Sequence, residues 1–391
     1  MVISSLSQFW DLLKHPGTPL NLSEYVTYND GRDLTSGGFG DVRKGRLNIG
    51  PDTSFVAVKS IRLSSVPNSD QERMNLRLRR EVKVWNRLKH ENIVRLLGTT
   101  QRDSCVGMVS PWMAAGDLHS FVRSDISLSL RRDITCDAAR GLAYLHSKDI
   151  IHGDLTCKNI LIDNQGKACI TDFGLSILKA EFEGTHYMTS TAGGAIRYRA
   201  PELFPGPSND PAVLNGFTPV LTPACDIWSL ASVILQTLTG VVPYHNIKDH
   251  YCVLITIVLG GIRPPRLEVA ALTDEYWNCI NTMWGKPGTP SSRPRAEQAY
   301  TSLLGLRDTA LDQRGVWLKH ALREVRRVGV ECKRWRKERQ LPLALFHVRD
   351  MEERPFRETC FLELQREFLP SHLYEHVSEF LTGCHDGRPE L

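Results

Sequence analysis

Two short motifs contain the residue types that phosphoryl transfer needs. The first is His152-Gly153-Asp154-Leu155-Thr156-Cys157-Lys158-Asn159, and Asp172-Phe173-Gly174 begins thirteen residues after its last member. Carboxylate and amide oxygens are ligands that Mg²⁺ prefers, and a positioned carboxylate can accept the proton of a reacting hydroxyl. This combination predicts transfer of a phosphate group with Mg²⁺ neutralising the developing charge.

Two upstream features supply groups that could contact phosphates. The stretch Thr35-Ser36-Gly37-Gly38-Phe39-Gly40-Asp41-Val42 is a turn whose glycines let backbone amides approach an anion. Lys59 closes the apolar strand Val56-Ala57-Val58, and Glu81 opens a helical pattern from which it could pair with Lys59. Each feature alone also fits an ordinary hairpin, a snorkelling lysine or a charge on a solvated helix face.

The elements that must position these residues fall into two regions. From Val26 to about Lys89, the β-branched run Phe55–Val58 and one helical stretch, Gln71–Leu88, predict a sheet with a helix. From Ser120 to about Leu304 helical patterns dominate, including Leu130–His146 and Asp226–Leu238. The segment Ser110–Gly116 lies between them and is expected to connect the two regions.

The H-x-D-L-x-x-x-N pattern, followed by D-F-G and by Ala200-Pro201-Glu202, resembles the eukaryotic protein kinase family. Met283-Trp284 followed by Arg293-Pro294, with Gly261-Ile262-Arg263-Pro264-Pro265 before them, resembles the tyrosine kinase and tyrosine kinase-like groups, and we interpret the chain as tyrosine kinase-like. The resemblance extends from about Tyr28 to Leu304. It implies an α+β, bilobal protein kinase fold, with a β-rich N-lobe that carries one long helix and a mainly α-helical C-lobe. The predicted divisions are a leader (1–25), a kinase domain (26–305, with N-lobe 26–109, hinge 110–116 and C-lobe 117–305) and a mostly helical C-terminal extension (306–391).

By this resemblance Asp154 accepts or aligns the substrate hydroxyl, assisted by Lys59, Glu81 and Lys158. Asn159 and Asp172 would hold Mg²⁺. The residues expected to bind ATP are Thr35, Gly37, Gly38, Gly40, Val42, Ala57, Lys59, Ser110, Pro111, Trp112, Met113 and Leu161.

The same resemblance implies three structural contacts. Asp226 would hold the catalytic loop through backbone amides, and Arg293 would pair with Glu202. A packed column would link the lobes through Leu96, Trp85, Phe173 and His152.

Four positions depart from the family pattern. Thr35 replaces the first glycine of the phosphate loop, and Gly153 replaces the arginine that usually precedes the catalytic aspartate. Thr156 and Ala195 occupy positions where serine/threonine kinases usually have lysine and a hydroxyl residue. These departures favour the alternative of a pseudokinase, an ATP-binding scaffold with little catalysis. Among active kinases, serine or threonine is favoured over tyrosine as the acceptor, and a small-molecule phosphotransferase is disfavoured by the A-P-E segment and its Arg293.

Composition bounds the partners and the compartment. The formal charge of +4 arises from 48 basic and 44 acidic residues, which is too balanced to predict a nucleic-acid binder. The resemblance to protein kinases implies a protein substrate. The ten cysteines form no C-x-x-C pair, and reduced thiols fit a cytoplasmic or nuclear location. The longest apolar run, Tyr251–Ile262, is about 12 residues, shorter than the roughly 20 of a membrane helix, so no transmembrane segment is expected. Residues 1–13 have no basic region of the kind that opens a secretory signal.

The C-terminal segment is locally basic. Between Arg314 and Arg339 there are ten lysines and arginines against three glutamates, with apolar residues near one helical face. Two interpretations stay open, a basic amphipathic helix for an acidic partner or membrane surface, and a helix that packs on the large lobe with its basic side in water.

Overall fold

The structure is a computed structural model of the whole chain. It describes residues 3, 5–14, 18–28, 34–37, 40–61, 82–102, 105–173, 195–206, 210, 217–259, 261–286 and 288–309. The chain divides into two compact units, Met1–Asp308 and Thr309–Leu391, and nearly all described residues belong to the first. Apart from residues 306–309, the predicted extension lies outside the described residues, and so does the whole basic segment 314–339.

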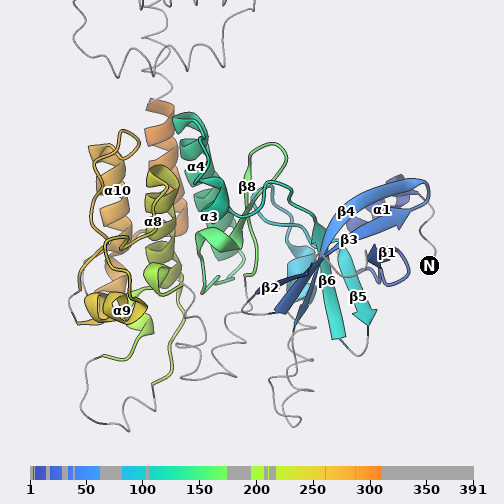
Figure 1. Cartoon of the computed structure of the whole chain (residues 1–391), viewed down its shortest axis with the longest axis horizontal. Helices are drawn as coiled ribbons and strands as arrows, with labels where there is room; N and C mark the ends of the chain where they lie inside the picture. The colour runs from blue at the N-terminus through green and yellow to red at the C-terminus, as the bar shows by residue number, and fades with distance from the viewer. Residues whose placement is uncertain are drawn as a thin grey trace, which may run out of the picture. The chain divides into compact units, whose positions relative to one another are not determined.

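The N-terminal half of the first unit is built on an antiparallel sheet in the order β1-β3-β4-β6-β5, with β2 also pairing with β3 (Figure 1). The strands are β1 (Val26–Tyr28), β2 (Leu34–Gly37), β3 (Gly40–Ile49), β4 (Asp52–Ile61), β5 (Gly98–Arg102) and β6 (Cys105–Pro111). β3 and β4 are long and turn tightly at Gly50, whose φ of 59° costs glycine little. The predicted strand Phe55–Val58 lies within β4, and Val56 and Val58 are buried.

The helix α1 (Leu6–Lys14) is part of the core of this sheet. Its Phe9 and Leu13 are buried together with Leu22 and with valines and leucines from β1, β3, β4 and β6. Arg95 donates from Nη2 to the carbonyl of Leu13 at 3.1 Å. The leader, for which the sequence indicated only an amphipathic fragment, thus contributes apolar area to the N-lobe.

The C-terminal half of the unit is mainly helical. Its described elements are α3 (Leu118–Phe121), α4 (Leu128–His146), α8 (Pro223–Thr239), α9 (His250–Val258), α10 (Asp274–Trp284), a helix over 296–309, and the short pair β7 (Ile160–Ile162) and β8 (Ala168–Ile170). Figure 1 shows α8 between α4 and α10, and both neighbours contact it. Because α8 is buried along nearly its whole length, it forms the centre of this lobe.

Local signals define the ends of the two longest helices. The Ser127 hydroxyl accepts a hydrogen bond from the Leu130 amide at the start of α4, at 3.2 Å. α8 begins with Pro223 at its first position and ends at Gly240, which is left-handed with φ 74°. The helices predicted over Leu130–His146 and Asp226–Leu238 are therefore confirmed, each slightly longer than predicted.

A short segment after the helical residues 82–87 joins the two halves. The Val94 amide donates to the Ile170 carbonyl at 2.9 Å, and the Asn92 amide Nδ2 donates to the Ala168 carbonyl at 3.0 Å. Gly141 in α4 permits this approach, since a Cβ there would stand 2.7 Å from the Asn92 carbonyl oxygen. The α+β fold with a β-rich lobe and a helical lobe is confirmed.

Candidate active site

The catalytic loop is held from beneath by Asp226 of α8. One carboxylate oxygen, Oδ1, accepts the Gly153 amide at 2.8 Å, and Oδ2 accepts the His152 amide at 2.8 Å. His146 contributes a third contact, from Nε2 to Oδ2 at 2.9 Å. Asp226 is 1% exposed, so these charge-assisted hydrogen bonds form away from water. The predicted role of Asp226 is confirmed, whereas the contact with His146 was missed.

Gly153 has a conformation that explains its residue type. Its φ is 75°, in the left-handed region where a side chain with a Cβ is strained. The glycine that replaces an arginine therefore lets the loop present its amide to Asp226 at little conformational cost. Asp172 also has a positive φ, 62°, which an aspartate tolerates better than most residues.

Hydrogen bonds link the loop that carries Asp154 and Asn159 to the residue that precedes Asp172. The Asn159 amide Nδ2 donates to the Asp154 carbonyl at 2.8 Å. The Asn159 carbonyl accepts the Thr171 amide at 2.9 Å, and the Thr171 carbonyl contacts His152 Nε2 at 3.0 Å. Asp172, the residue after Thr171, therefore follows directly on a segment that is hydrogen-bonded to the loop of Asp154 and Asn159.

Lys59 reaches Asp172 from the other lobe. Its ammonium lies 2.5 Å from Oδ1 of Asp172, and the two side chains are 12% and 22% exposed. Lys59 stands in β4 directly opposite Val42 of β3, which stands opposite Thr35 of β2. The strand register thus places the phosphate-loop hairpin, closed by the pair Gly37 and Gly40, one strand away from the lysine.

Two predicted site residues cannot be located. Gly38 and Glu81 lie outside the described residues, so the predicted pair between Lys59 and Glu81 stays a prediction. The described backbone includes Thr35, Gly37 and Gly40. Lys158 is exposed on η1 (Cys157–Asn159).

The predicted adenine-side residues lie on β3, β4, β6 and β7 and in the segment directly after β6. Ser110 is buried and stands opposite Ala57 in the strand register. Val42, Ala57 and Leu161 are half-buried, as are Pro111, Trp112 and Met113. The Trp112 amide donates to the Phe55 carbonyl at 3.1 Å, whereas within the described chain the Met113 amide donates to no acceptor.

The residues present fit a Mg²⁺ ion that arrives with phosphates. Asn159 uses its Nδ2 for Asp154, which leaves its Oδ1 for a cation, and Oδ2 of Asp172 accepts no hydrogen bond from a described residue. In the described part of the chain, no three or more histidine, cysteine, aspartate or glutamate side chains are placed so that together they could hold a metal ion. Mg²⁺ characteristically takes one or two protein oxygens and completes its shell with phosphates and water.

The lobes also meet through an aromatic contact. Trp85 and Phe173 form an edge-to-face pair with ring centroids 5.6 Å apart, and Trp85 packs against the cluster that contains Leu96. The indole Nε1 donates to the Val94 carbonyl at 2.8 Å. This arrangement bears out the predicted column for Leu96, Trp85 and Phe173. His152 is fully buried beneath, where it contacts the Thr171 carbonyl.

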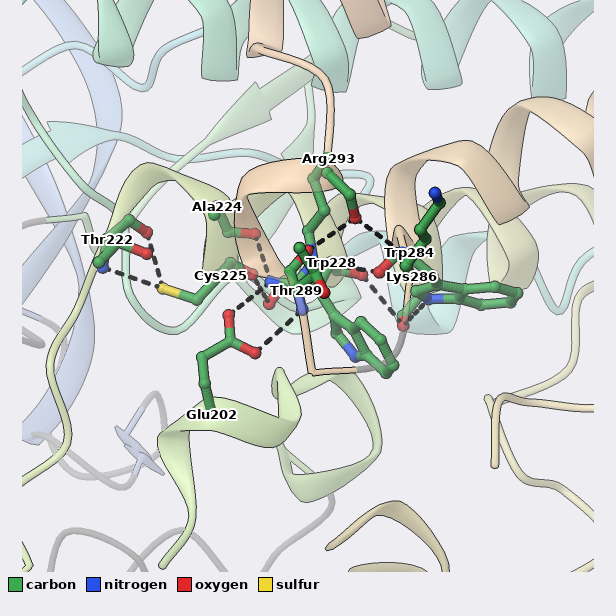
Figure 2. A network of polar contacts seen from close by, with 12 residues as sticks. Glu202, Thr222, Ala224, Cys225, Trp228, Trp284, Lys286, Thr289 and Arg293 are labelled. Atoms are coloured by element: carbon green, nitrogen blue, oxygen red, sulfur yellow. Dashed lines mark hydrogen bonds and ion pairs between the residues drawn. The ribbon is translucent and has the colours of Figure 1, made fainter. Parts of the chain in front are cut away.

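The predicted pair between Glu202 and Arg293 is confirmed (Figure 2). The guanidinium contacts both carboxylate oxygens, at 2.5 and 2.9 Å, and donates further to the carbonyls of Ala224 and Trp284. Such a bidentate pair fixes orientation as well as charge. It fastens η3 (Pro201–Leu203) to the start of α8.

Cys157 is not a nucleophile. Its side chain is fully buried beside α8, and burial raises the pKa of its thiol. A protonated, inaccessible sulfur cannot attack a substrate at neutral pH. The interpretation of this cysteine as a packed thiol is consistent with its surroundings.

Comparison with known proteins identifies the family. The sequence profile of the protein kinase domain matches residues 28–300. This chain belongs to the protein kinase family. It is 30% identical over 244 residues to the leucine-rich repeat receptor-like protein kinase PXC2 of Arabidopsis thaliana, a match that covers 61% of this chain and 23% of that protein.

Two further relatives are similar over comparable stretches. The RAF proto-oncogene serine/threonine-protein kinase of Xenopus laevis is 28% identical over 253 residues, 64% of this chain and 36% of that protein. The CBL-interacting serine/threonine-protein kinase 1 of Arabidopsis thaliana is 32% identical over 221 residues, 56% of this chain and 46% of that protein. The chain thus spans less than half the length of each of these relatives.

Proposed function

We propose that this protein kinase domain transfers the γ-phosphate of ATP, with Mg²⁺, to a hydroxyl group on a protein. The observation that carries the proposal is the convergence of Lys59 from β4 with Asp172, next to Asn159 and Asp154. A cation, two metal-ligand oxygens and a buried carboxylate at one point are the groups that phosphoryl transfer requires.

Each residue has a role in this proposal. Asp154 aligns the acceptor hydroxyl and takes its proton, and Lys59, oriented with Glu81, contacts the ATP phosphates. Lys158 faces the transferred group from the exposed side of η1. Asn159 and Asp172 would hold Mg²⁺, which bridges the phosphates and neutralises their charge.

The adenine is proposed to bind between Ala57 and Leu161. The Met113 amide, which has no acceptor among the described residues, would donate to a ring nitrogen. Pro111 retains its carbonyl as an acceptor although it lacks an amide. Ser110 leaves space behind the ring because its side chain is small.

Serine or threonine is the proposed acceptor. The relatives whose names state an acceptor, including the RAF protein and the CBL-interacting kinase, are serine/threonine-protein kinases. We also propose that the chain belongs to the tyrosine kinase-like group, because Met283-Trp284 followed by Arg293-Pro294 resembles the sequence of that group.

We also propose the domain limits 26–305, protein substrates and a cytoplasmic or nuclear site of action. Among the described residues, no helix combines the length and apolar character needed to cross a bilayer. An acidic partner for residues 314–339 stays a proposal that rests on their charge alone.

The test is phosphate transfer from radiolabelled MgATP to generic protein substrates and to the chain itself. We expect Asp154→Asn and Lys59→Met each to lower transfer by about 100-fold or more, because each removes a group that acts in the transition state. Phosphoamino-acid analysis of the product then identifies the acceptor.

Asp149→Asn is the matched control. Asp149 is exposed after α4 with φ 56°, a conformation that asparagine tolerates, so this variant should retain wild-type transfer. The pseudokinase alternative would be supported if the wild type and all three variants bound nucleotide but incorporated phosphate only at the same background level. Thr35, Gly153, Thr156 and Ala195, which depart from the family pattern, favour that alternative.

A further inference from the structure

Asp154 has a cationic neighbour that belongs to none of the catalytic motifs. Arg199 follows η2 (Ala195–Tyr198), and its Nη2 lies 3.4 Å from Oδ1 of Asp154. The two side chains are 3% and 7% exposed. Charges shielded from water in this way interact more strongly than a pair on the surface.

The segment that carries Arg199 is held on both sides. Before it, the guanidinium of Arg197 donates to a row of main-chain carbonyls, those of Pro243, Tyr244, Ile247 and Lys248. The Tyr198 carbonyl accepts the hydroxyl of Ser229 in α8 at 2.9 Å. After it, Glu202 is paired with Arg293. Arg199 therefore projects from a backbone that has little freedom to move.

The contact engages one side of the carboxylate. Within the described chain, Oδ2 of Asp154 accepts no hydrogen bond, whereas Oδ1 faces the guanidinium. The carboxylate is thus fixed through one oxygen and has its other oxygen available for a substrate hydroxyl. Thr156, buried two residues further along, brings no charge to the same loop.

We propose that Arg199 is a positioning residue for catalysis, which orients Asp154 toward the acceptor hydroxyl by binding its Oδ1. This role rests on the proposed kinase function. It predicts an effect on the rate of the chemical step rather than on nucleotide binding, because Arg199 acts through the carboxylate and not through ATP.

The experiment compares kcat and KM for ATP in the full chain and in Arg199→Met, Arg199→Lys, Asp154→Asn and the double variant Asp154→Asn/Arg199→Met. We expect Arg199→Met to lower kcat by about tenfold or more, since a small misplacement of a catalytic group is costly, with KM for ATP within about twofold of the wild type. Arg199→Lys should recover part of the loss. In the Asp154→Asn background, Arg199→Met should cause no further loss.

Arg131→Lys separates positioning from general destabilisation. Arg131 of α4 donates to the carbonyls of Thr237 and Val122, away from Asp154. This variant should lower the melting temperature and leave kcat unchanged. If Arg199→Met does not fold, the comparison is made with Arg199→Lys and the double variant, in which neither charge is left buried alone.

The outcomes distinguish the two proposals. Wild-type transfer that Asp154→Asn does not reduce would overturn the kinase function. A dead Asp154→Asn together with an Arg199→Met variant that retains wild-type kcat would overturn the positioning role alone. Losses from the two single variants that multiply in the double variant would also overturn the positioning role and leave the kinase function standing.

Discussion

Two carboxylates of the site, Asp226 and Asp172, are held in different ways. Asp226 is almost completely buried and accepts two backbone amides and a histidine. Asp172 is 22% exposed, and Lys59 is its one ion-pair partner among the described residues. The catalytic loop is therefore anchored by many buried bonds, whereas the predicted metal ligand retains a free oxygen. In the proposed function, the buried contacts lie beneath the reacting groups, and the more exposed carboxylate lies where a cation and phosphates would bind.

Asp226→Asn should cause the largest losses of stability and of phosphate transfer. An amide can accept only one of the two loop amides and turns its NH₂ toward the other, so we expect a loss of about 3 kcal/mol in the free energy of unfolding. Phosphate transfer should fall with it. Chemical denaturation and the transfer assay measure the two effects.

Asp163→Asn is its matched control. Asp163 accepts the amides of Gln165 and Lys167 through one oxygen in a turn that asparagine can reproduce. A similar loss of unfolding free energy in both variants would mean that burial does not strengthen the hydrogen bonds of Asp226.

Gly153→Ala should have the next largest effect. A methyl group in the left-handed conformation of Gly153 costs about 1–2 kcal/mol, so the melting temperature should fall while Asp226 continues to bind the loop amides. Gly116 provides the comparison, since it has φ 76° and open space around a built Cβ. Equal losses at both positions would show that backbone conformation alone sets the cost.

Trp85→Phe probes the weaker contact between the lobes. The phenyl ring keeps part of the contact with Phe173 but loses the hydrogen bond to the Val94 carbonyl, so we expect a loss of about 1 kcal/mol. If the contact between Trp85 and Phe173 helps to place Lys59, KM for ATP should rise as well. An unchanged KM would restrict Trp85 to a packing role.

The buried thiols should show the smallest effect. Burial raises the pKa of Cys136, of Cys169 and of Cys225 to about 12, and raises that of Cys157 as well. Alkylating reagents at pH 8 should therefore leave these four residues unmodified in the folded chain, as mass spectrometry can show. Rapid inactivation through Cys157 would contradict its buried position.

The same shifts predict how stability depends on pH. A folded-state thiol pKa above the unfolded value of about 8.5 means that the unfolded chain loses its protons first. The contribution of these thiols is complete below that pH and declines as the pH rises through the interval up to about 12. A series of thermal unfolding curves between pH 7 and 10 tests this direction.

Much of the site could be predicted because its residues lie within short motifs. Asp154 and Asn159 share one loop, and Asp172 follows directly after the β7–β8 hairpin, so their spacing constrains their geometry. The apolar run predicted the strand that ends at Lys59, whereas the role of Lys59 rests on the resemblance to kinases. The helical lobe was readable because α4 and α8 have long apolar patterns and clear end signals.

The contacts that escaped prediction join residues far apart in the chain. Arg199 meets Asp154 across 45 positions, and nothing in the composition around Arg199 distinguishes it from a surface arginine. Likewise, the leader was indicated as an amphipathic fragment, and only the folded sheet offered a face that buries Phe9 and Leu13. A side chain's partner in such cases is decided by how the elements pack.

By itself, the sequence predicted the family and the residues proposed to handle phosphate and metal, because local motifs carry their own backbone geometry. Tertiary structure alone decided that Arg199 meets Asp154, that His146 also contacts Asp226 and where the N-terminal helix packs. The physical reason is that burial and long-range pairing are properties of the assembled core, and a linear pattern specifies the groups without specifying their neighbours.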